Sequence, residues 1–126
     1  MNPNSPMAEG NPGNEFIDIL KPLDGEVIIK KNVNSGFIGT NLKQQIDYLG
    51  IKTLVVAGLT TDHCVSTTVR MAGNYGYTVW LINDATATFE KVSISGERFS
   101  AQLMHDTAVA SINDEFAEVV NFKDVF

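Results

Sequence analysis

The feature that most constrains the fold is an apolar run at residues 53–58 that leads directly into a polar, helix-starting turn. The run reads Thr-Leu-Val-Val-Ala-Gly and does not alternate between polar and apolar residues. Such a run predicts a strand that is covered on both faces, as in a parallel sheet. Thr60, Thr61 and Asp62 follow at once and predict the start of a helix that ends near Asn74.

Strand-like and helix-like segments alternate along the rest of the chain. The pattern predicts strands at 27–29, 77–82 and 117–120, helices at about 42–49 and 97–112, and a loop at 84–96. Short connections between such elements indicate right-handed βαβ units in an α/β domain with a mainly parallel sheet. Residues 1–14 hold three of the four prolines, so we expect an irregular arm there and a single domain over 15–126.

Composition narrows the classes of function. A formal charge of -6 argues against non-specific binding to nucleic acid or to an anionic membrane. The sequence contains neither an apolar run long enough to cross a bilayer nor a signal peptide, and its one cysteine cannot form an internal disulfide, so we expect a cytoplasmic location. The two histidines and the cysteine lack metal-ligand spacing, and we expect no metal or other cofactor.

Cys64 is the main candidate for chemistry because it falls in the first turn of the helix that follows the buried strand. At the carboxyl end of a parallel strand, where ligands collect, the N-terminus of a helix stabilises a thiolate and offers N–H groups to an oxyanion. The alternative is a small buried hydrophobe on a core helix, since cysteine is among the most buried residue types. Position alone leaves both interpretations open.

The other candidates are weaker on the residues alone. Lys31 ends a predicted strand and could be a solvated charge, and the adjacent Lys30 could equally be the one that points inward. His63 neighbours Cys64 but should face elsewhere on a helix, so a pocket-lining or structural role fits it better than that of a general base. Asp62 fits a helix cap, and His105 fits a surface or core position.

Two stretches make the sequence resemble the isochorismatase-like cysteine hydrolases. The first is Val-Val-Ala-Gly-Leu-Thr-Thr-Asp-His-Cys-Val at 55–65, followed by Thr-Thr-Val-Arg-Met-Ala at 67–72. The second is Glu-Val-Ile-Ile-Lys-Lys-Asn-Val-Asn-Ser-Gly-Phe-Ile-Gly-Thr at 26–40, in which Gly36 replaces the family's usual alanine. The stretch Asn-Asp-Ala-Thr-Ala at 83–87 resembles the next strand end. The resemblance covers nearly all of 15–121 and implies a three-layer α/β/α, Rossmann-like fold.

The resemblance also implies roles for individual residues. Cys64 would be the nucleophile, Lys31 rather than Lys30 the catalytic lysine, and the N–H groups of Thr60 and Cys64 the oxyanion hole, with a cis peptide between residues 59 and 60. The expected substrate-binding residues are Phe37, Thr61 and His63. The family's catalytic aspartate lies on a first strand that the sequence lacks, so we expect a domain that is incomplete at its N-terminus, with an exposed apolar edge.

Three functions remain open at the level of sequence. The first is hydrolysis of a C–N bond in a small amide, carbamoyl compound or ureide through a thioester-type intermediate, which a cysteine favours over vinyl-ether hydrolysis. The second is a catalytically impaired homologue that binds a small molecule or is completed by another chain, in a homo-oligomer or otherwise. The third is a redox sensor, which the lack of a resolving cysteine disfavours.

Overall fold

Three parallel strands form the main sheet of the protein. The computed structural model describes residue 5 and residues 7–125. Strand β1 (Thr53–Leu59) pairs with β2 (Thr78–Ala87), which pairs with β5 (Glu118–Val120), and both pairings are parallel. The order β1-β2-β5 places β1 at one edge of this sheet. The α/β class and the mainly parallel sheet predicted from the alternation of elements are therefore confirmed.

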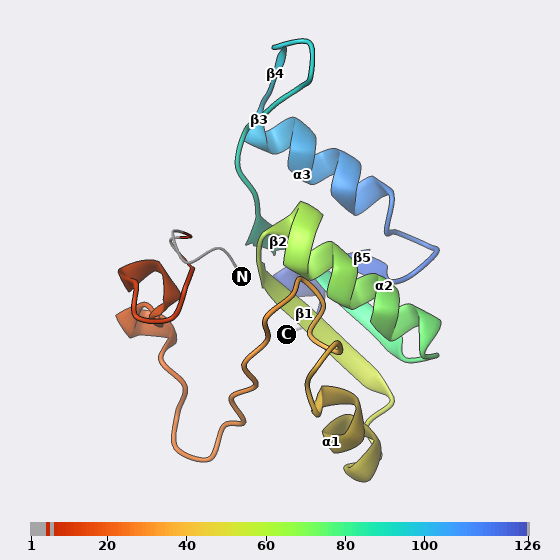
Figure 1. Ribbon diagram of the computed structural model, residues 1–126. Helices are drawn as coiled ribbons and strands as arrows, with labels where there is room; N and C mark the ends of the chain where they lie inside the picture. The colour runs from red at the N-terminus through yellow and green to blue at the C-terminus, as the bar shows by residue number, and fades with distance from the viewer. Residues whose placement is uncertain (1–4, 6, 126) are drawn as a thin grey trace.

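The three α-helices share an apolar core with the sheet. Helices α1 (Leu42–Tyr48), α2 (Ser66–Asn74) and α3 (Ala101–Ala110) follow the predicted order, and α2 crosses in front of the strands in Figure 1. Burial of these apolar side chains supplies most of the folding free energy, at about 25 cal/mol per Å². The buried members of the core are Phe37, Ile46, Val65, Val69, Ala72, Tyr77, Val79, Leu81, Ile112 and Ala117.

The opposite face of β1 is open, which corrects the prediction of a strand covered on both sides. Exposure alternates along β1, and the side chains of Val55 and Leu59 are 46% and 63% exposed. The sequence does not show this alternation, because apolar residues occupy both the exposed and the more buried positions of the strand. Helices over this second face, which the resemblance to a three-layer fold implies, are not among the elements that the structure describes.

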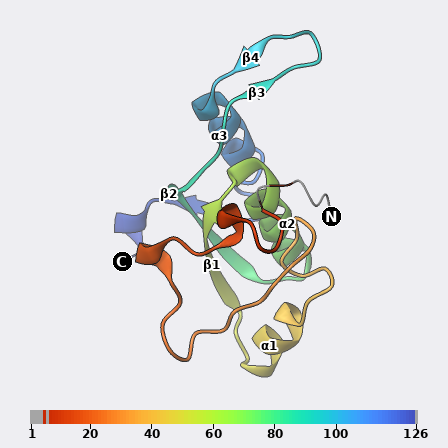
Figure 2. The same ribbon diagram turned by 60° about the vertical axis from the view of Figure 1, so that its left-hand side comes forward.

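The segment 27–29 forms no strand in the structure, contrary to its β-branched sequence. It belongs to an irregular stretch that loops away from the sheet before α1, as Figure 2 shows, and both Val27 and Ile28 are exposed. A strand needs a neighbour that accepts its backbone hydrogen bonds, and none of the described strands pairs with this segment. The prediction of a strand at 27–29 relied on local β propensity alone and is wrong.

The predicted loop at 84–96 is also wrong in part. Strand β2 continues to Ala87, and a hairpin of β3 (Lys91–Val92) and β4 (Arg98–Phe99) projects from the body of the molecule. Helix α3 therefore begins at Ala101 rather than near residue 97. Its N-cap is Ser100, whose side chain accepts a hydrogen bond from the N–H of Leu103.

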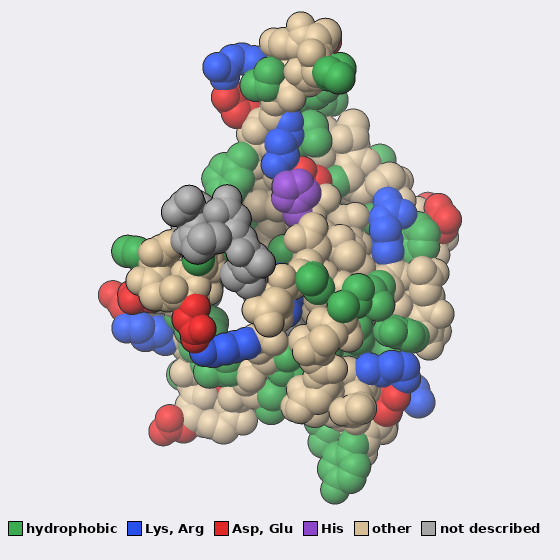
Figure 3. Space-filling view, viewed as in Figure 1, with side chains coloured by type: hydrophobic (Ala, Val, Ile, Leu, Met, Phe, Trp, Pro, Cys, Tyr) green, Lys and Arg blue, Asp and Glu red, His purple; other side chains and the backbone are tan. Residues whose placement is uncertain are grey.

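Short 3-10 helices lie outside the sheet and the three α-helices. They span Pro12–Asn14, Asp18–Leu20 and Phe122–Asp124. None of the helices in the described part of the chain combines the length and apolarity that crossing a bilayer requires. On the face drawn in Figure 3, acidic and basic side chains are interspersed rather than gathered into one large patch of a single sign.

Candidate active site

The candidate site is built on the turn that joins β1 to α2. The peptide bond between Leu59 and Thr60 is cis, as the resemblance implied. A single π-helical turn, Thr61–Val65, follows and runs straight into α2. The carbonyl of Thr60 accepts hydrogen bonds from the N–H groups of His63 and Val65, at 3.1 and 3.2 Å. Cys64 therefore lies at the carboxyl end of a parallel strand, on the turn that the sequence predicted.

Lys31 reaches this turn from the irregular segment before α1. Its ammonium donates to Cys64 Sγ, with 3.0 Å between Nζ and Sγ, and to the carbonyl oxygen of Val33 at 3.1 Å. Lys30 points away, since its Nζ lies 3.1 Å from Glu9 Oε1. The structure thus brings Lys31, and not Lys30, to the thiol. A cysteine that acts as a nucleophile does so through its sulfur, and here the sulfur is in direct contact with a positively charged group.

Asn34 is a second neighbour of the thiol that sequence reasoning missed. Its Oδ1 lies 3.9 Å from Cys64 Sγ, and the neighbouring residues hold the segment in place. Ser35 is 1% exposed and donates to Met71 Sδ, while the N–H of Gly36 donates to the hydroxyl of Thr68 at 2.9 Å. These contacts to α2 tie the segment that carries Asn34 to the helix that carries the thiol. Asn34 belongs to the motif at 26–40 that the sequence analysis singled out. The spacing of that motif did not show which of its side chains reaches the thiol.

Asp62 forms a polar cluster on the side of the turn that faces the hairpin. Its carboxylate accepts a hydrogen bond from the hydroxyl of Thr88, and its Oδ2 lies 3.6 Å from both Lys91 Nζ and His63 Nε2. Burial raises the pKa of Asp62, but the bonds from Thr88 and from its own N–H, with the charges of His63 and Lys91, lower that pKa below its ordinary value of 3.8. Asp62 therefore stays ionised and holds the hairpin to the turn.

The three predicted substrate-binding residues differ in their exposure and in their contacts. His63 is half exposed beside Asp62, and no hydrogen bond joins it to Cys64. Thr61 is fully buried, with its hydroxyl 2.9 Å from His105 Nδ1, so its side chain lies behind the turn rather than on the open side. His105 itself is a core histidine, one of the two positions that the sequence allowed.

Phe37, which was expected among the substrate-binding residues, lies in the apolar core. Its ring is 8% exposed and packs against Tyr75 and Tyr77, with ring centroids 5.3 and 6.3 Å apart. Tyr77 directly precedes β2, whereas Cys64 follows the end of the parallel strand β1. Phe37 therefore lies toward the opposite end of the sheet, in the core, because the chain turns away from the thiol after Ser35.

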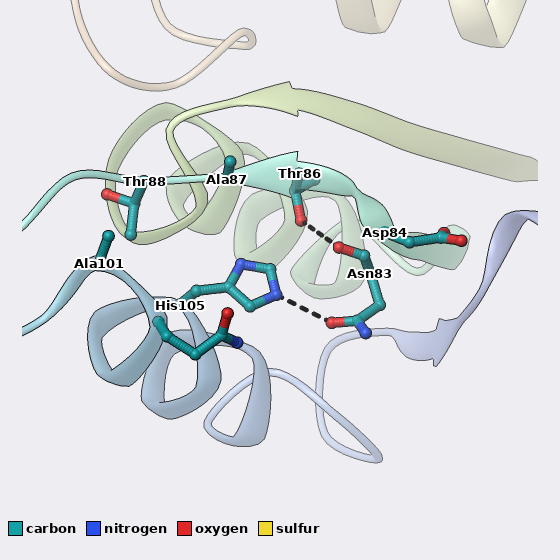
Figure 4. A pocket seen from close by; sticks show the side chains of 8 residues that line it. Asn83, Asp84, Thr86, Ala87, Thr88, Ala101 and His105 are labelled. Atoms are coloured by element: carbon teal, nitrogen blue, oxygen red, sulfur yellow. Dashed lines mark hydrogen bonds between the residues drawn. The ribbon is translucent and has the colours of Figure 1, made fainter.

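A hollow of about 300 Å³ opens at the carboxyl end of β2, beside α3. Figure 4 shows the side chains around it, and Cys64 is not one of them. The sequence led us to expect ligands at the end of the strand that carries Cys64, whereas this hollow lies beside β2. Its lining residues are Asn83, Asp84, Thr86, Ala87, Thr88, Ala101, Gln102 and His105. Across the described residues, no three acidic, histidine or cysteine side chains gather where they could hold a metal ion.

Known proteins are similar to this chain in sequence and in fold. A family model described as the isochorismatase domain matches residues 2–124. The chain belongs to the isochorismatase family. The isochorismatase family protein YrdC of Bacillus subtilis is 46% identical over 118 residues, which is 94% of this chain and 63% of that protein. A crystal structure of an isochorismatase-family protein from Chromobacterium violaceum matches with a TM-score of 0.94 and 40% identity, over 99% of this chain and 65% of that one.

Amidohydrolases are among the family relatives. The maleamate amidohydrolase of Pseudomonas putida is 27% identical over 94% of this chain and 50% of that protein. The isochorismatase model begins at residue 2, and so includes the stretch that we set apart as an arm. The expected truncation of the isochorismatase domain is not borne out by this match. The chain spans 63% of the length of YrdC.

Proposed function

We propose that the chain hydrolyses a C–N bond in a small amide, carbamoyl compound or ureide, with Cys64 as the nucleophile. The observation that carries this proposal is the contact of 3.0 Å between Lys31 Nζ and Cys64 Sγ, at the turn after β1. A thiol that is half-buried at a strand end and paired with an ammonium has the setting of a reactive cysteine rather than of an inert core residue. The amidohydrolase relative supports C–N bonds as the target.

The proposed reaction has two halves. In the first, the Cys64 thiolate attacks the carbonyl carbon, and the N–H groups of Thr60 and Cys64 stabilise the oxyanion that forms. The tetrahedral intermediate collapses as the C–N bond breaks, the nitrogen leaves with the proton that the thiol gave up, passed on through water, and a thioester remains on Sγ. In the second half, water attacks the thioester carbon, the C–S bond breaks, and the acid and the free thiol are released. Lys31 stabilises the thiolate in both halves.

Turnover measured directly tests this proposal. The purified chain is incubated with a panel of amides, carbamoyl compounds and ureides, and the release of ammonia or amine is followed. We expect activity on at least one class and its loss in Cys64→Ala, with Lys30→Ala as the matched control that keeps it. Activity that survives in Cys64→Ala would contradict the assignment of the nucleophile.

A second candidate is a catalytically impaired member of the family that binds a partner or is completed by another chain. One observation favours it: among residues 5 and 7–125, no carboxylate is hydrogen-bonded to Cys64. General acid–base catalysis typically contributes roughly 10²–10⁴-fold, so such a chain would be a poor catalyst on its own. The open face of β1, which is an edge strand of the described sheet, is where a second chain, of the same or another kind, would supply a carboxylate.

These two candidates differ in one assay. If another chain completes the site, turnover per Cys64 rises when the chain is mixed with a longer version that is extended upstream and carries Cys64→Ala. If the chain acts alone, that addition leaves turnover unchanged. The inactive thiol of the added chain ensures that any gain comes from the chain under study.

A further inference from the structure

His105 lies directly behind the turn that carries Cys64, and the proposed reaction does not use it. Only 9% of the residue is exposed, and both ring nitrogens are engaged. Nδ1 lies 2.9 Å from Thr61 Oγ1, and Nε2 lies 2.9 Å from Asn83 Oδ1, the bond drawn in Figure 4. These contacts join the site turn to α3 and to the carboxyl end of β2. The three residues are distant in sequence, so only the fold brings them together.

A chain of hydrogen bonds fixes the direction of these contacts. The carboxylate of Asp124 can only accept, so the amide nitrogen of Asn121 faces it, at 3.4 Å. Asn121 Oδ1 then accepts from the amide nitrogen of Asn83, also at 3.4 Å. Asn83 Oδ1 is thereby left to face His105 Nε2, which must carry the ring proton in the neutral imidazole. Nδ1 is then an acceptor, and the hydroxyl of Thr61 donates to it.

This direction matters because Thr61 sits between the two residues that form the proposed oxyanion hole. Thr61 is 0% exposed, so water cannot replace the imidazole as the partner of its hydroxyl. A buried hydroxyl without a partner is unfavourable, and the turn could relieve that only by moving. Movement of Thr61 would displace the N–H groups of Thr60, which precedes it, and of Cys64, which lies in the same helical turn.

We propose that His105 is a positioning residue that holds Thr61, and with it the turn bearing Thr60 and Cys64, in the geometry the thiolate needs. The role of His105 in hydrolysis rests on the proposed function. Its effect on the geometry around the thiol does not. Rates of iodoacetamide labelling at Cys64 report that geometry without any substrate. Failure of the hydrolase proposal would therefore leave this test intact.

Two conservative variants of His105 separate positioning from simple packing. In His105→Asn the amide oxygen lies near the former Nδ1 position and can still accept from Thr61, whereas in His105→Gln the amide lies near the former Nε2 position. We expect labelling at neutral pH to fall roughly three- to tenfold in His105→Gln, the effect of about one hydrogen bond, and to stay near wild type in His105→Asn. Thr61→Val should match His105→Gln, and Thr61→Ser should match wild type.

The same set of variants contains the outcome that would overturn the proposal. Equal losses in the asparagine and glutamine variants, in proportion to their thermal unfolding midpoints, would mean that His105 acts only through packing. Unchanged labelling in Thr61→Val would mean that the hydroxyl plays no part. In the double variant Thr61→Val with His105→Gln, positioning predicts no loss beyond that of Thr61→Val alone, whereas additive losses would contradict it.

Discussion

At the scale of single residues, the pair of Lys31 and Cys64 decides what the site can do. We expect Lys31→Met to slow iodoacetamide labelling of Cys64 by roughly three- to tenfold at neutral pH, because the sulfur loses the hydrogen bond from the ammonium. Lys30→Met is the matched control, since its Nζ contacts Glu9 instead, and should label at the wild-type rate. The reverse result, with Lys30→Met slow and Lys31→Met normal, would show that the wrong lysine has been assigned.

The ionisation of Asp62 should make the stability of the fold depend on pH in acid. Its pKa is lower in the folded chain than its ordinary value of 3.8, so it stabilises the fold above that pH. This contribution should be lost as the pH falls from about 3.8 through the lower folded pKa. Urea unfolding of wild type and Asp62→Asn should therefore differ at pH 6, and the difference should shrink as the pH falls below 3.8. A constant difference across that range would mean that ionisation of Asp62 is not involved.

At the scale of elements, two glycines test how tightly α2 is packed. A Cβ on Gly73 would lie 2.7 Å from the carbonyl oxygen of Phe116, which is backbone and cannot easily move. A Cβ on Gly36 would meet only side-chain atoms, of which the nearest are carbons of Leu42 at 3.2 Å and Thr68 at 3.3 Å. We expect Gly73→Ala to lower the free energy of unfolding by about 1–3 kcal/mol, and Gly36→Ala to cost less, as measured by urea unfolding. Equal costs would contradict this packing.

The sequence predicted the elements whose signals are local. The order of β1, α2, β2, α3 and β5 and the place of Cys64 on the turn after β1 follow from apolar runs and cap residues. Prediction from the sequence failed where structure depends on contacts between residues that are far apart in the chain. Val27 and Ile28 carry strand propensity but have no pairing neighbour in the described sheet, and the bond between Thr61 and His105 spans 44 residues.

At the scale of the whole molecule, the open face of the sheet is the feature to test. Val55 is 46% exposed on that face, while its neighbour Val56 packs against the core. We expect Val55→Thr to change the free energy of unfolding by less than about 0.5 kcal/mol, and Val56→Thr to lower it by about 1–3 kcal/mol because its hydroxyl faces the core. A large, concentration-dependent cost for Val55→Thr would mean that a second copy covers this face in solution.

The central claim is that Cys64 forms a covalent bond to the substrate's carbonyl carbon. Intact-protein mass spectrometry after rapid acid quench, on a substrate that the chain turns over, tests this most directly. We expect a species heavier by the mass of the acyl group, located on Cys64 by peptide mapping, sensitive to hydroxylamine and missing in Cys64→Ala. Turnover in which Cys64→Ala releases product as fast as wild type, with the thiol unmodified throughout, would contradict it.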